Sequence, residues 1–135
     1  MISIDTFLDD EFLNKYWTDG LIISSPTGST AYSLSVGGPI VLPGSENLVI
    51  APIASHNLTV RPLVIPDNTV IRLEVKSRSG SYLVSADNRT EVMDIKHNIF
   101  RIRKAGEHLN MVRLPFNNYY STLRNKLMWG VDRRN

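Results

Sequence analysis

Hydroxyl-bearing residues and glycines are concentrated between residues 19 and 39 of this 135-residue chain. The segment begins with Asp19 ahead of a short apolar run, Leu21–Ile23, continues through a Ser/Thr/Gly-rich turn, and ends at Gly37-Gly38-Pro39. A helix that starts in such a turn offers free backbone N–H groups, which favour a phosphate. A nearby carboxylate accepts hydrogen bonds from a sugar diol. The pattern therefore indicates a site for a ribose and an adjoining phosphate.

A purely structural role for the same residues stays open. A Ser/Thr/Gly cluster is most often a turn with a helix cap, and aspartate before glycine is most often a turn residue. The functional interpretation is favoured because Thr27, Ser29 and Thr30 supply more hydroxyls than one cap needs, and because Tyr32 offers a ring or phenol. The segment lacks the Gly-Lys-Ser/Thr of a P-loop and the Gly-x-Ser-x-Gly of a nucleophile elbow.

The composition excludes several classes of protein. The net charge is +2, and the densest basic group is only Arg101, Arg103 and Lys104, so we expect no nucleic-acid partner. There is no cysteine, which excludes disulfides and thiolate sites, and the three histidines are too scattered for a metal site. No apolar run approaches the roughly 18 residues of a membrane span, and no signal peptide precedes Ile2–Ile4. We expect a single cytoplasmic domain without membrane contact.

The elements that would position this site are mostly strands. Apolar residues recur with a period of two or in short blocks. Strands are predicted at Ile2–Ile4, Leu21–Ile23, Leu48–Ala51, Leu63–Ile65, Thr69–Lys76, Ser81–Ala86, Asn98–Lys104 and His108–Leu114. The strand at 81–86 is expected to return antiparallel to 69–76 after a turn at 77–80, and Asp87-Asn88 is expected to be the next tight turn.

Helices are few. Asp9–Tyr16 is either a helical turn or a hairpin corner, Ser29–Val36 is a short helix stopped by Gly37, and Tyr119–Trp129 is the longest candidate. In that last segment Tyr120, Leu127 and Trp129 are expected in the core. About eight to ten strands with one or two short helices predict a mainly β fold, a β-sandwich.

In its motifs the chain resembles the C-terminal domain of NAD kinases, the enzymes that make NADP. The matching elements stand in family order along nearly the whole sequence. They are Asp19–Ser24, Pro26–Ser35, Gly37–Pro39, Ala51–Ile53 with His56, Arg61–Val64, and Leu123–Leu127 with Trp129. One mild departure is Ser24-Ser25-Pro26 in place of the family's Ser-Thr-Pro, which keeps a hydroxyl.

The resemblance implies a β-sandwich that binds NAD or NADP and assembles into a homo-oligomer, a dimer or tetramer. Asp19 would bind the ribose nearest the nicotinamide, and Ala54 and His56 would lie near a base. Arg89 stands where family members carry a polar residue that reaches the dinucleotide. The remaining residues implied to line the dinucleotide pocket are Thr27, Thr30, Ala31, Tyr32, Ser33, Leu34 and Ser35. Arg61 is open between two roles, pairing with a phosphate or with a neighbouring acid.

The catalytic half implied by the resemblance is missing from this sequence. The family's Gly-Gly-Asp-Gly, with the aspartate proposed as base, is absent, as is its Asn-Glu or Asn-Asp pair. Phosphoryl transfer needs an aligned hydroxyl, a base and a charge-neutralised donor. We therefore expect an inactive part of a longer enzyme whose N-terminal α/β domain holds the catalytic aspartate and, with a divalent metal such as Mg²⁺, the ATP or polyphosphate. No metal or cofactor is expected on this part alone.

Two other functions remain open from the sequence. One is a non-catalytic β-sandwich that mediates assembly without binding a nucleotide. The other is the corresponding domain of a lipid kinase, which a hydrophobic acyl-binding surface would favour and the hydroxyl-rich tract does not. Met1 leads directly into the predicted strand Ile2–Ile4, so we expect the chain to start at a domain boundary.

Overall fold

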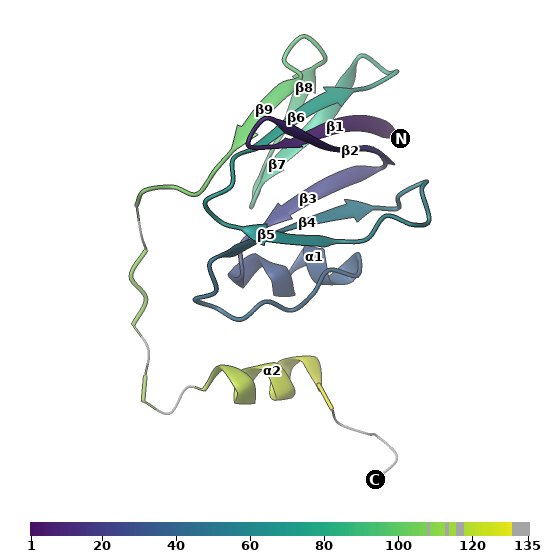
Figure 1. The fold of residues 1–135 in the computed structure, drawn as a ribbon. Coiled ribbons are helices and arrows are strands. Elements are labelled where there is room, and N and C mark those ends of the chain that lie inside the picture. The colour runs from purple at the N-terminus through teal and green to yellow at the C-terminus, as the bar shows by residue number, and fades with distance from the viewer. Residues whose placement is uncertain (108, 113, 116–117, 131–135) are drawn as a thin grey trace. The chain divides into compact units, whose positions relative to one another are not determined.

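The computed structural model describes residues 1–107, 109–112, 114–115 and 118–130. It contains two compact units, Met1–Lys104 and Ala105–Asn135. The first unit holds nine strands among its described residues (Figure 1), within the predicted range of eight to ten. The mainly β fold class is thus confirmed.

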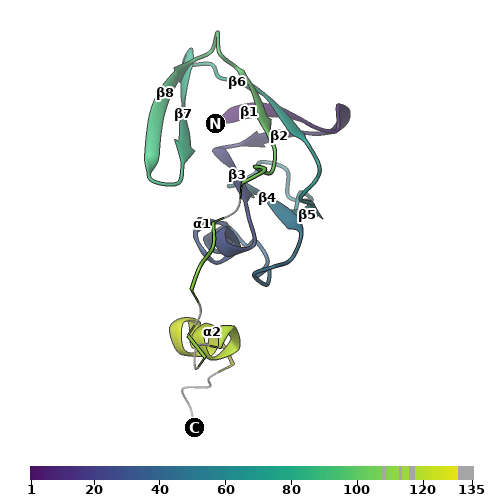
Figure 2. The same ribbon diagram turned by 90° about the vertical axis from the view of Figure 1, so that its left-hand side faces the viewer.

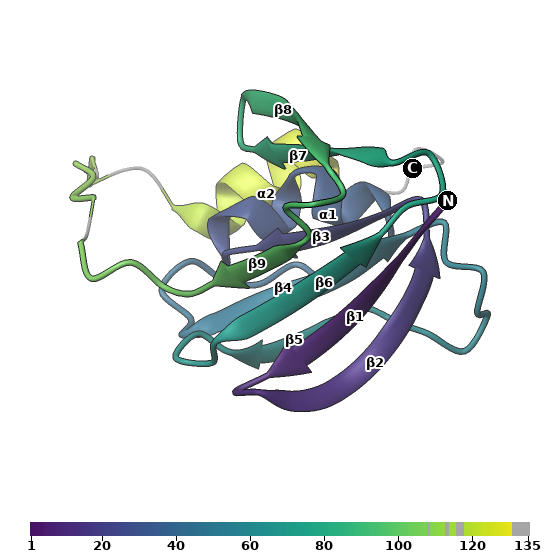
Figure 3. The ribbon, with the colours of Figure 1, turned by 90° about the horizontal axis from the view of Figure 1, so that it is seen from above.

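The first sheet has four antiparallel strands in the order β2-β1-β6-β9 (Figure 3). The strands are β1 (Ile2–Leu8), β2 (Glu11–Thr18), β6 (Ile71–Lys76) and β9 (Ile99–Ile102). Asp9 and Asp10 connect β1 to β2 with φ of 50° and 66°, a left-handed turn that aspartate tolerates. The open choice at Asp9–Tyr16 is thereby decided in favour of a hairpin.

The second sheet has three antiparallel strands in the order β3-β4-β5, made of β3 (Gly20–Ser24), β4 (Asn47–Ile53) and β5 (Leu63–Pro66). The two sheets face each other in Figure 1, and residues of both build one core, which makes the unit a sandwich. Its buried members are Ile4, Tyr16, Ile50, Ile65, Ile71, Leu73, Val75 and Tyr82. Central strand β4 is the most protected, since Val49, Ile50 and Ala51 are completely buried.

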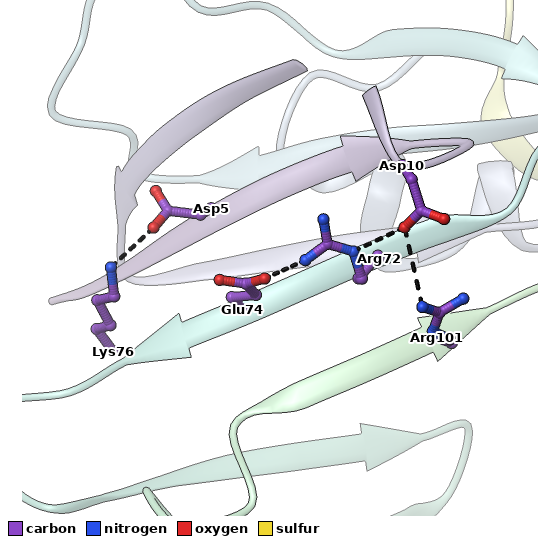
Figure 4. Close-up of polar contacts among 6 residues, drawn as sticks. All are labelled: Asp5, Asp10, Arg72, Glu74, Lys76 and Arg101. Carbon is purple, nitrogen blue, oxygen red and sulfur yellow. Dashed lines mark hydrogen bonds and ion pairs between the residues drawn. The ribbon is translucent and has the colours of Figure 1, made fainter. Parts of the chain in front are cut away.

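The outward face of the first sheet carries ion pairs instead of a second apolar layer (Figure 4). Asp5 lies between Lys15 and Lys76 at 3.3 and 2.9 Å, and Arg72 contacts both Asp10 and Glu74. In β6, Arg72, Glu74 and Lys76 alternate with the buried Ile71, Leu73 and Val75, as the period-two pattern predicted at 69–76 requires.

The prediction that Ser81–Ala86 pairs with the strand before it is wrong. Strand β7 (Ser81–Ala86) pairs with β8 (Arg89–Asp94) in a separate two-stranded hairpin, closed by the predicted turn at Asp87-Asn88. Both edges of β6 are already occupied by β1 and β9, so no edge remains for β7. The hairpin packs through Tyr82, whose hydroxyl donates to the carbonyl of His97.

The predicted helix at Ser29–Val36 is divided in two. A 3₁₀ turn, η1 (Thr27–Thr30), is followed by one α-helical turn, α1 (Tyr32–Ser35). Ala31 separates them with φ −95° and ψ −134°, which is outside the helical region. Gly37 ends the helix at φ 84°, as predicted. Both pieces lie on the face of the second sheet that points away from the first (Figure 2).

The second unit contains helix α2 (Tyr119–Leu127), whose N-cap Asn118 accepts a hydrogen bond from the Tyr120 N–H at 2.8 Å. Leu123 is its one buried residue, and Tyr120, Leu127 and Trp129 are 53, 40 and 59% exposed. Their predicted place in the core is therefore wrong, because one short helix has a single inward stripe and here it is narrow. The strand predicted at His108–Leu114 is also wrong for residues 109–112 and 114; positions 108 and 113 lie outside the described residues. No described helix is long and apolar enough to cross a bilayer.

Candidate functional site

Two serine hydroxyls of the Ser/Thr/Gly tract, those of Ser29 and Ser33, are buried in the folded domain. The Ser29 side chain is completely buried, donates to the carbonyl of Pro26 at 2.6 Å and accepts from the N–H of Val41 at 3.0 Å. It therefore fastens η1 to the segment that follows the helix. Ser33 is 1% exposed and faces the interior, so its contact with a ligand stays a prediction.

The other hydroxyls and the aromatic ring of the tract are accessible. Thr27 is exposed, with its Oγ1 3.1 Å from the Oγ of Ser25, and Tyr32 is 60% exposed. Thr30 is half-buried and donates to the carbonyl of Thr27 at 3.4 Å. Among the remaining predicted site residues of this tract, Ala31 and Ser35 are exposed and Leu34 is half-buried. The structure thus presents most of the predicted tract on one short, solvent-facing stretch.

Glycines determine how the tract is folded. Gly38 donates its N–H to the carbonyl of Ser33 at 2.8 Å, and an added Cβ there would lie 2.6 Å from that carbonyl oxygen. No side chain fits at this distance, so the return of the chain after α1 requires glycine at this position. Gly37 supplies the left-handed φ just before it.

Asp19 lies at the corner between β2 and β3, next to the end of β4. Its backbone N–H donates to the carbonyl of Ile53 at 3.0 Å, and its carboxylate is 62% exposed, 3.6 Å from the amino group of Met1. On the other side of this corner, the N–H of His56 donates to the carbonyl of Trp17 at 2.8 Å. The structure therefore brings Asp19 together with the segment of Ala54 and His56.

An open pocket of about 300 Å³ adjoins this corner. One wall is the end of α1 at Val36 and Gly37, and the other is the β4–β5 loop. Of the predicted site residues, Ala54 lines it, with the uncommon φ of 47°. The remaining lining residues are Pro52, Ser55, Asn57, Leu58, Val60, Arg61 and Pro62. Polar and apolar groups contribute about equally to this lining, so the pocket can offer both hydrogen bonds and apolar contact.

Arg89 is the predicted site residue that no described contact connects to the others. It pairs with Ala86 at the closed end of the β7–β8 hairpin and is exposed. That end of the hairpin points toward the layer that holds β3 and α1 in Figure 2. Its role as a ligand contact stays a prediction.

Two pocket-lining residues, Ser55 and Asn57, and the buried Thr18 could not be identified as site residues from the sequence. Ser55 and Asn57 are isolated polar residues in a loop and give no periodic signal. Thr18, completely buried at the β2–β3 corner, hydrogen-bonds both the Ile53 carbonyl and the Gly20 carbonyl, yet it stands at the end of an ordinary strand pattern. Arg61 pairs with no described acid; it donates to the Leu58 and Val60 carbonyls at 2.5 and 3.0 Å.

A metal site does not emerge from the described residues, which contain no group of three His, Asp or Glu side chains placed to hold an ion. The chemistry that these residues can supply is hydrogen bonding from hydroxyls and backbone groups, one exposed carboxylate, and apolar contact. That set can bind and orient a polar ligand.

Comparison with known proteins gives several matches. The NAD kinase of Flavobacterium johnsoniae is 54% identical over 135 residues, and that of Porphyromonas gingivalis strain W83 is 49% identical over 131 residues. These alignments cover 100% and 97% of this chain but only 46% and 45% of the relatives. The chain thus spans about half the length of the curated relatives it matches.

Solved structures give the same result for the fold. A yeast NADH kinase complexed with NADH superposes with a TM-score of 0.73 at 25% identity, covering 97% of this chain and 41% of that one. An NAD kinase from Archaeoglobus fulgidus in complex with ATP superposes with a TM-score of 0.70 at 27% identity, covering 78% of this chain and 40% of that one. Residues 1–114 match the model of the ATP-NAD kinase C-terminal domain. The chain therefore belongs to the ATP-NAD kinase C-terminal domain family.

Proposed function

We propose that this chain is the NAD-binding part of an NAD kinase, which transfers a phosphoryl group to the adenosine ribose 2′-hydroxyl of NAD to give NADP. Family membership supports this proposal, and the yeast relative was solved with NADH. Family membership also favours this function over the lipid-kinase alternative.

The observation that carries the proposal is the corner at the end of β4. There the exposed carboxylate of Asp19 and the pocket-lining Ala54 are tied to one another through the carbonyl of Ile53. A carboxylate accepts hydrogen bonds from both hydroxyls of a ribose, and a pocket whose lining includes apolar groups suits a flat base.

In this proposal the tract at η1 and α1 holds the rest of the dinucleotide. Thr27 and Thr30 provide hydroxyls, and exposed Tyr32 provides a ring face or phenol. Ala31 and Ser35 allow close approach of the ligand, and Leu34 gives apolar contact. His56 and Arg89 complete the proposed set at the β4–β5 loop and the hairpin.

The donor side of the reaction belongs, in this proposal, to the remainder of the longer protein. Phosphoryl transfer depends on positioning and on neutralising the donor charge. ATP or polyphosphate, the divalent metal that accompanies ATP, and the base are all proposed to lie there. The residues of this chain bind and orient the acceptor, so no chemical step is assigned to them.

Titration with NAD tests the proposal on the chain itself. Isothermal calorimetry is expected to detect binding, and Asp19→Asn is expected to weaken it about tenfold, because a hydrogen bond to a charged group is worth about 1.5–3 kcal/mol. Glu11→Gln is the matched control, since Glu11 is an exposed acid on β2 outside the site. Equal affinity of the wild type and Asp19→Asn, or no binding at millimolar NAD, would contradict the proposal.

Self-association and location are further proposals. We propose a homo-oligomer, dimer or tetramer, supported by the uncovered apolar pair Leu83 and Val92, which are direct cross-strand neighbours and 66 and 73% exposed. Light scattering measures the mass, and a monomer at all concentrations would contradict the proposed self-association.

We also propose a cytoplasmic location. The cysteine-free composition supports it, and cell fractionation tests it.

A further inference from the structure

A single buried hydroxyl joins the two chain segments that form the proposed ribose-and-base corner. Thr18 is 0% exposed and ends β2. Its Oγ1 donates toward the carbonyl of Ile53, at the end of β4, and toward the carbonyl of Gly20 at 2.8 Å. Gly20 and Ile53 are direct partners where β3 pairs with β4, so the hydroxyl bridges this pair at the start of β3.

Two backbone hydrogen bonds run parallel to this connection. The N–H of Asp19 donates to the same Ile53 carbonyl at 3.0 Å, and the N–H of His56 donates to the carbonyl of Trp17 at 2.8 Å. Together with the Thr18 hydroxyl they form a clasp, which we define as the hydrogen bonds between residues 17–20 and 53–56. Each segment of the clasp carries proposed ligand contacts.

The clasp fixes the backbone at both contacts. The Ile53 carbonyl belongs to the peptide plane that leads into Ala54, so holding the oxygen also sets the orientation of Ala54. Ala54 has φ of 47°, a left-handed conformation that is unfavourable for a non-glycine residue. Such a conformation persists only where the surroundings hold it. Asp19 is also constrained, because its own N–H donates to the Ile53 carbonyl and the next residue, Gly20, accepts from the Thr18 hydroxyl.

The two segments are also in close steric contact. A Cβ added at Gly20 would lie 2.8 Å from Cδ1 of Ile53. A methyl group at Gly20 would therefore have to displace the end of the Ile53 side chain. Enlarging this position pushes against the same segment that the Thr18 hydroxyl holds.

We infer that Thr18 is a positioning residue for NAD: its hydroxyl sets the separation between the Asp19 carboxylate and the Ala54 wall of the pocket without contacting the ligand. This inference rests on the proposed function. It predicts that losing the hydroxyl weakens NAD binding specifically, while ATP use in the longer enzyme is unaffected.

The test uses the longer protein that carries this domain, with KM measured separately for NAD and for ATP. Thr18→Val keeps the shape and removes the hydroxyl, and it is expected to raise the KM for NAD about tenfold, from the loss of the two hydrogen bonds that the hydroxyl makes across the corner. The KM for ATP is expected to stay the same. Thr18→Ser restores the hydroxyl and is expected to restore the KM for NAD.

A second pair of variants opens the clasp without touching Thr18. Gly20→Ala is expected to raise the KM for NAD, and adding Ile53→Val, which removes the Cδ1 atom that the new methyl meets, is expected to lower it again. If Thr18→Val fails to fold, this pair decides the question. A rise in Gly20→Ala without recovery in the double variant would overturn the inference.

The remaining outcomes separate this inference from the proposed function. A proportional fall of kcat with both KM values unchanged would show only a loss of folded enzyme and overturn the inference. If Asp19→Asn raises the KM for NAD but Thr18→Val does not, the proposed function stands and the inference fails. If the longer protein makes no NADP at all, the proposed function fails first.

Discussion

Individual hydroxyls in this domain have opposite roles that their sequence positions do not reveal. Thr6 and Thr18 are both completely buried threonines on neighbouring strands of one sheet. The Thr18 hydroxyl joins two carbonyls, whereas the Thr6 hydroxyl has no hydrogen-bond partner among the described residues. Neither threonine lies in a segment predicted to be a strand, and their hydrogen-bond partners depend on which segments approach them in three dimensions.

Replacing Thr6 by valine is expected to raise the free energy of unfolding by about 1 kcal/mol, because it removes a buried hydroxyl without a described partner at nearly constant shape. Thr18→Val is the matched comparison and is expected to lower that free energy by about 1–3 kcal/mol. Urea denaturation measures both. Equal effects of the two substitutions would contradict the different roles of the two hydroxyls.

Asp5 makes the stability depend on pH. Burial raises the pKa of this carboxyl, but the hydrogen bonds and charges of Lys76 and Lys15 outweigh burial and leave the pKa below its ordinary value of 3.8 (Figure 4). A lowered pKa in the folded state adds stability that is fully present above pH about 4 and is lost as the pH falls through the folded-state pKa. Removing the carboxylate should therefore flatten the acid side of the stability profile.

Asp5→Asn tests this expectation. Thermal unfolding between about pH 2 and about pH 7 is expected to show a smaller acid-induced loss of stability in the variant than in the wild type. Glu11→Gln, an exposed acid on the next strand, is expected to leave the profile unchanged. If the dependence of stability on acid pH is the same in Asp5→Asn as in the wild type, the contacts between Asp5 and the two lysines do not contribute to stability.

At the scale of elements, the strands could be predicted well because one buried face gives a period of two, as in Ile71, Leu73 and Val75. The pairing of β7 could not be predicted, because the sequence does not show that both edges of β6 are already paired with β1 and β9. The break in the predicted helix at Ala31 was equally hidden, since alanine is a strong helix former and the break arises from the surrounding contacts. Of the candidate site, the sequence identified the tract and Asp19 but not the clasp.

Gly38→Ala is expected to disrupt the end of α1. The new Cβ would collide with the Oγ of Ser33 and lie 2.6 Å from its carbonyl oxygen, and backbone cannot move aside cheaply. We expect a loss of about 1–3 kcal/mol in the free energy of unfolding, typical of overpacking. Gly106→Ala is the control, because a methyl group added there would meet nothing within 4 Å and its φ lies outside the left-handed region. Comparable losses in both variants would contradict the steric explanation.

At the scale of the whole molecule, the chain corresponds to about half of its relatives, and the site proposed for it concerns the acceptor, NAD, alone. The sequence predicted this division because the Gly-Gly-Asp-Gly motif is absent. The contribution of the second unit, Ala105–Asn135, to the fold could not be predicted. Leu109 and Val112 belong to a segment predicted to be a strand, yet both are exposed.

The isolated chain is expected to form no NADP from NAD with ATP or with polyphosphate, because its described residues place no base against the ribose hydroxyl. A coupled dehydrogenase assay that detects NADP measures this directly. The longer protein, which supplies the missing residues, is the positive control and is expected to be active. NADP formation by the isolated chain above the background of a heat-treated sample would overturn the assignment of catalysis to the other half.

The burial of strand β4 affects how the proposed binding corner is disrupted when the domain unfolds. Its central residues Val49, Ile50 and Ala51 are completely inaccessible, and the Ile53–Ala54 peptide follows directly at its end. Amide hydrogens in such a strand exchange with deuterium only when the entire domain opens. We therefore expect the β4 amides that precede the proposed binding corner to be among the slowest to exchange in the Met1–Lys104 unit, so that the corner is lost mainly when the native state itself is lost.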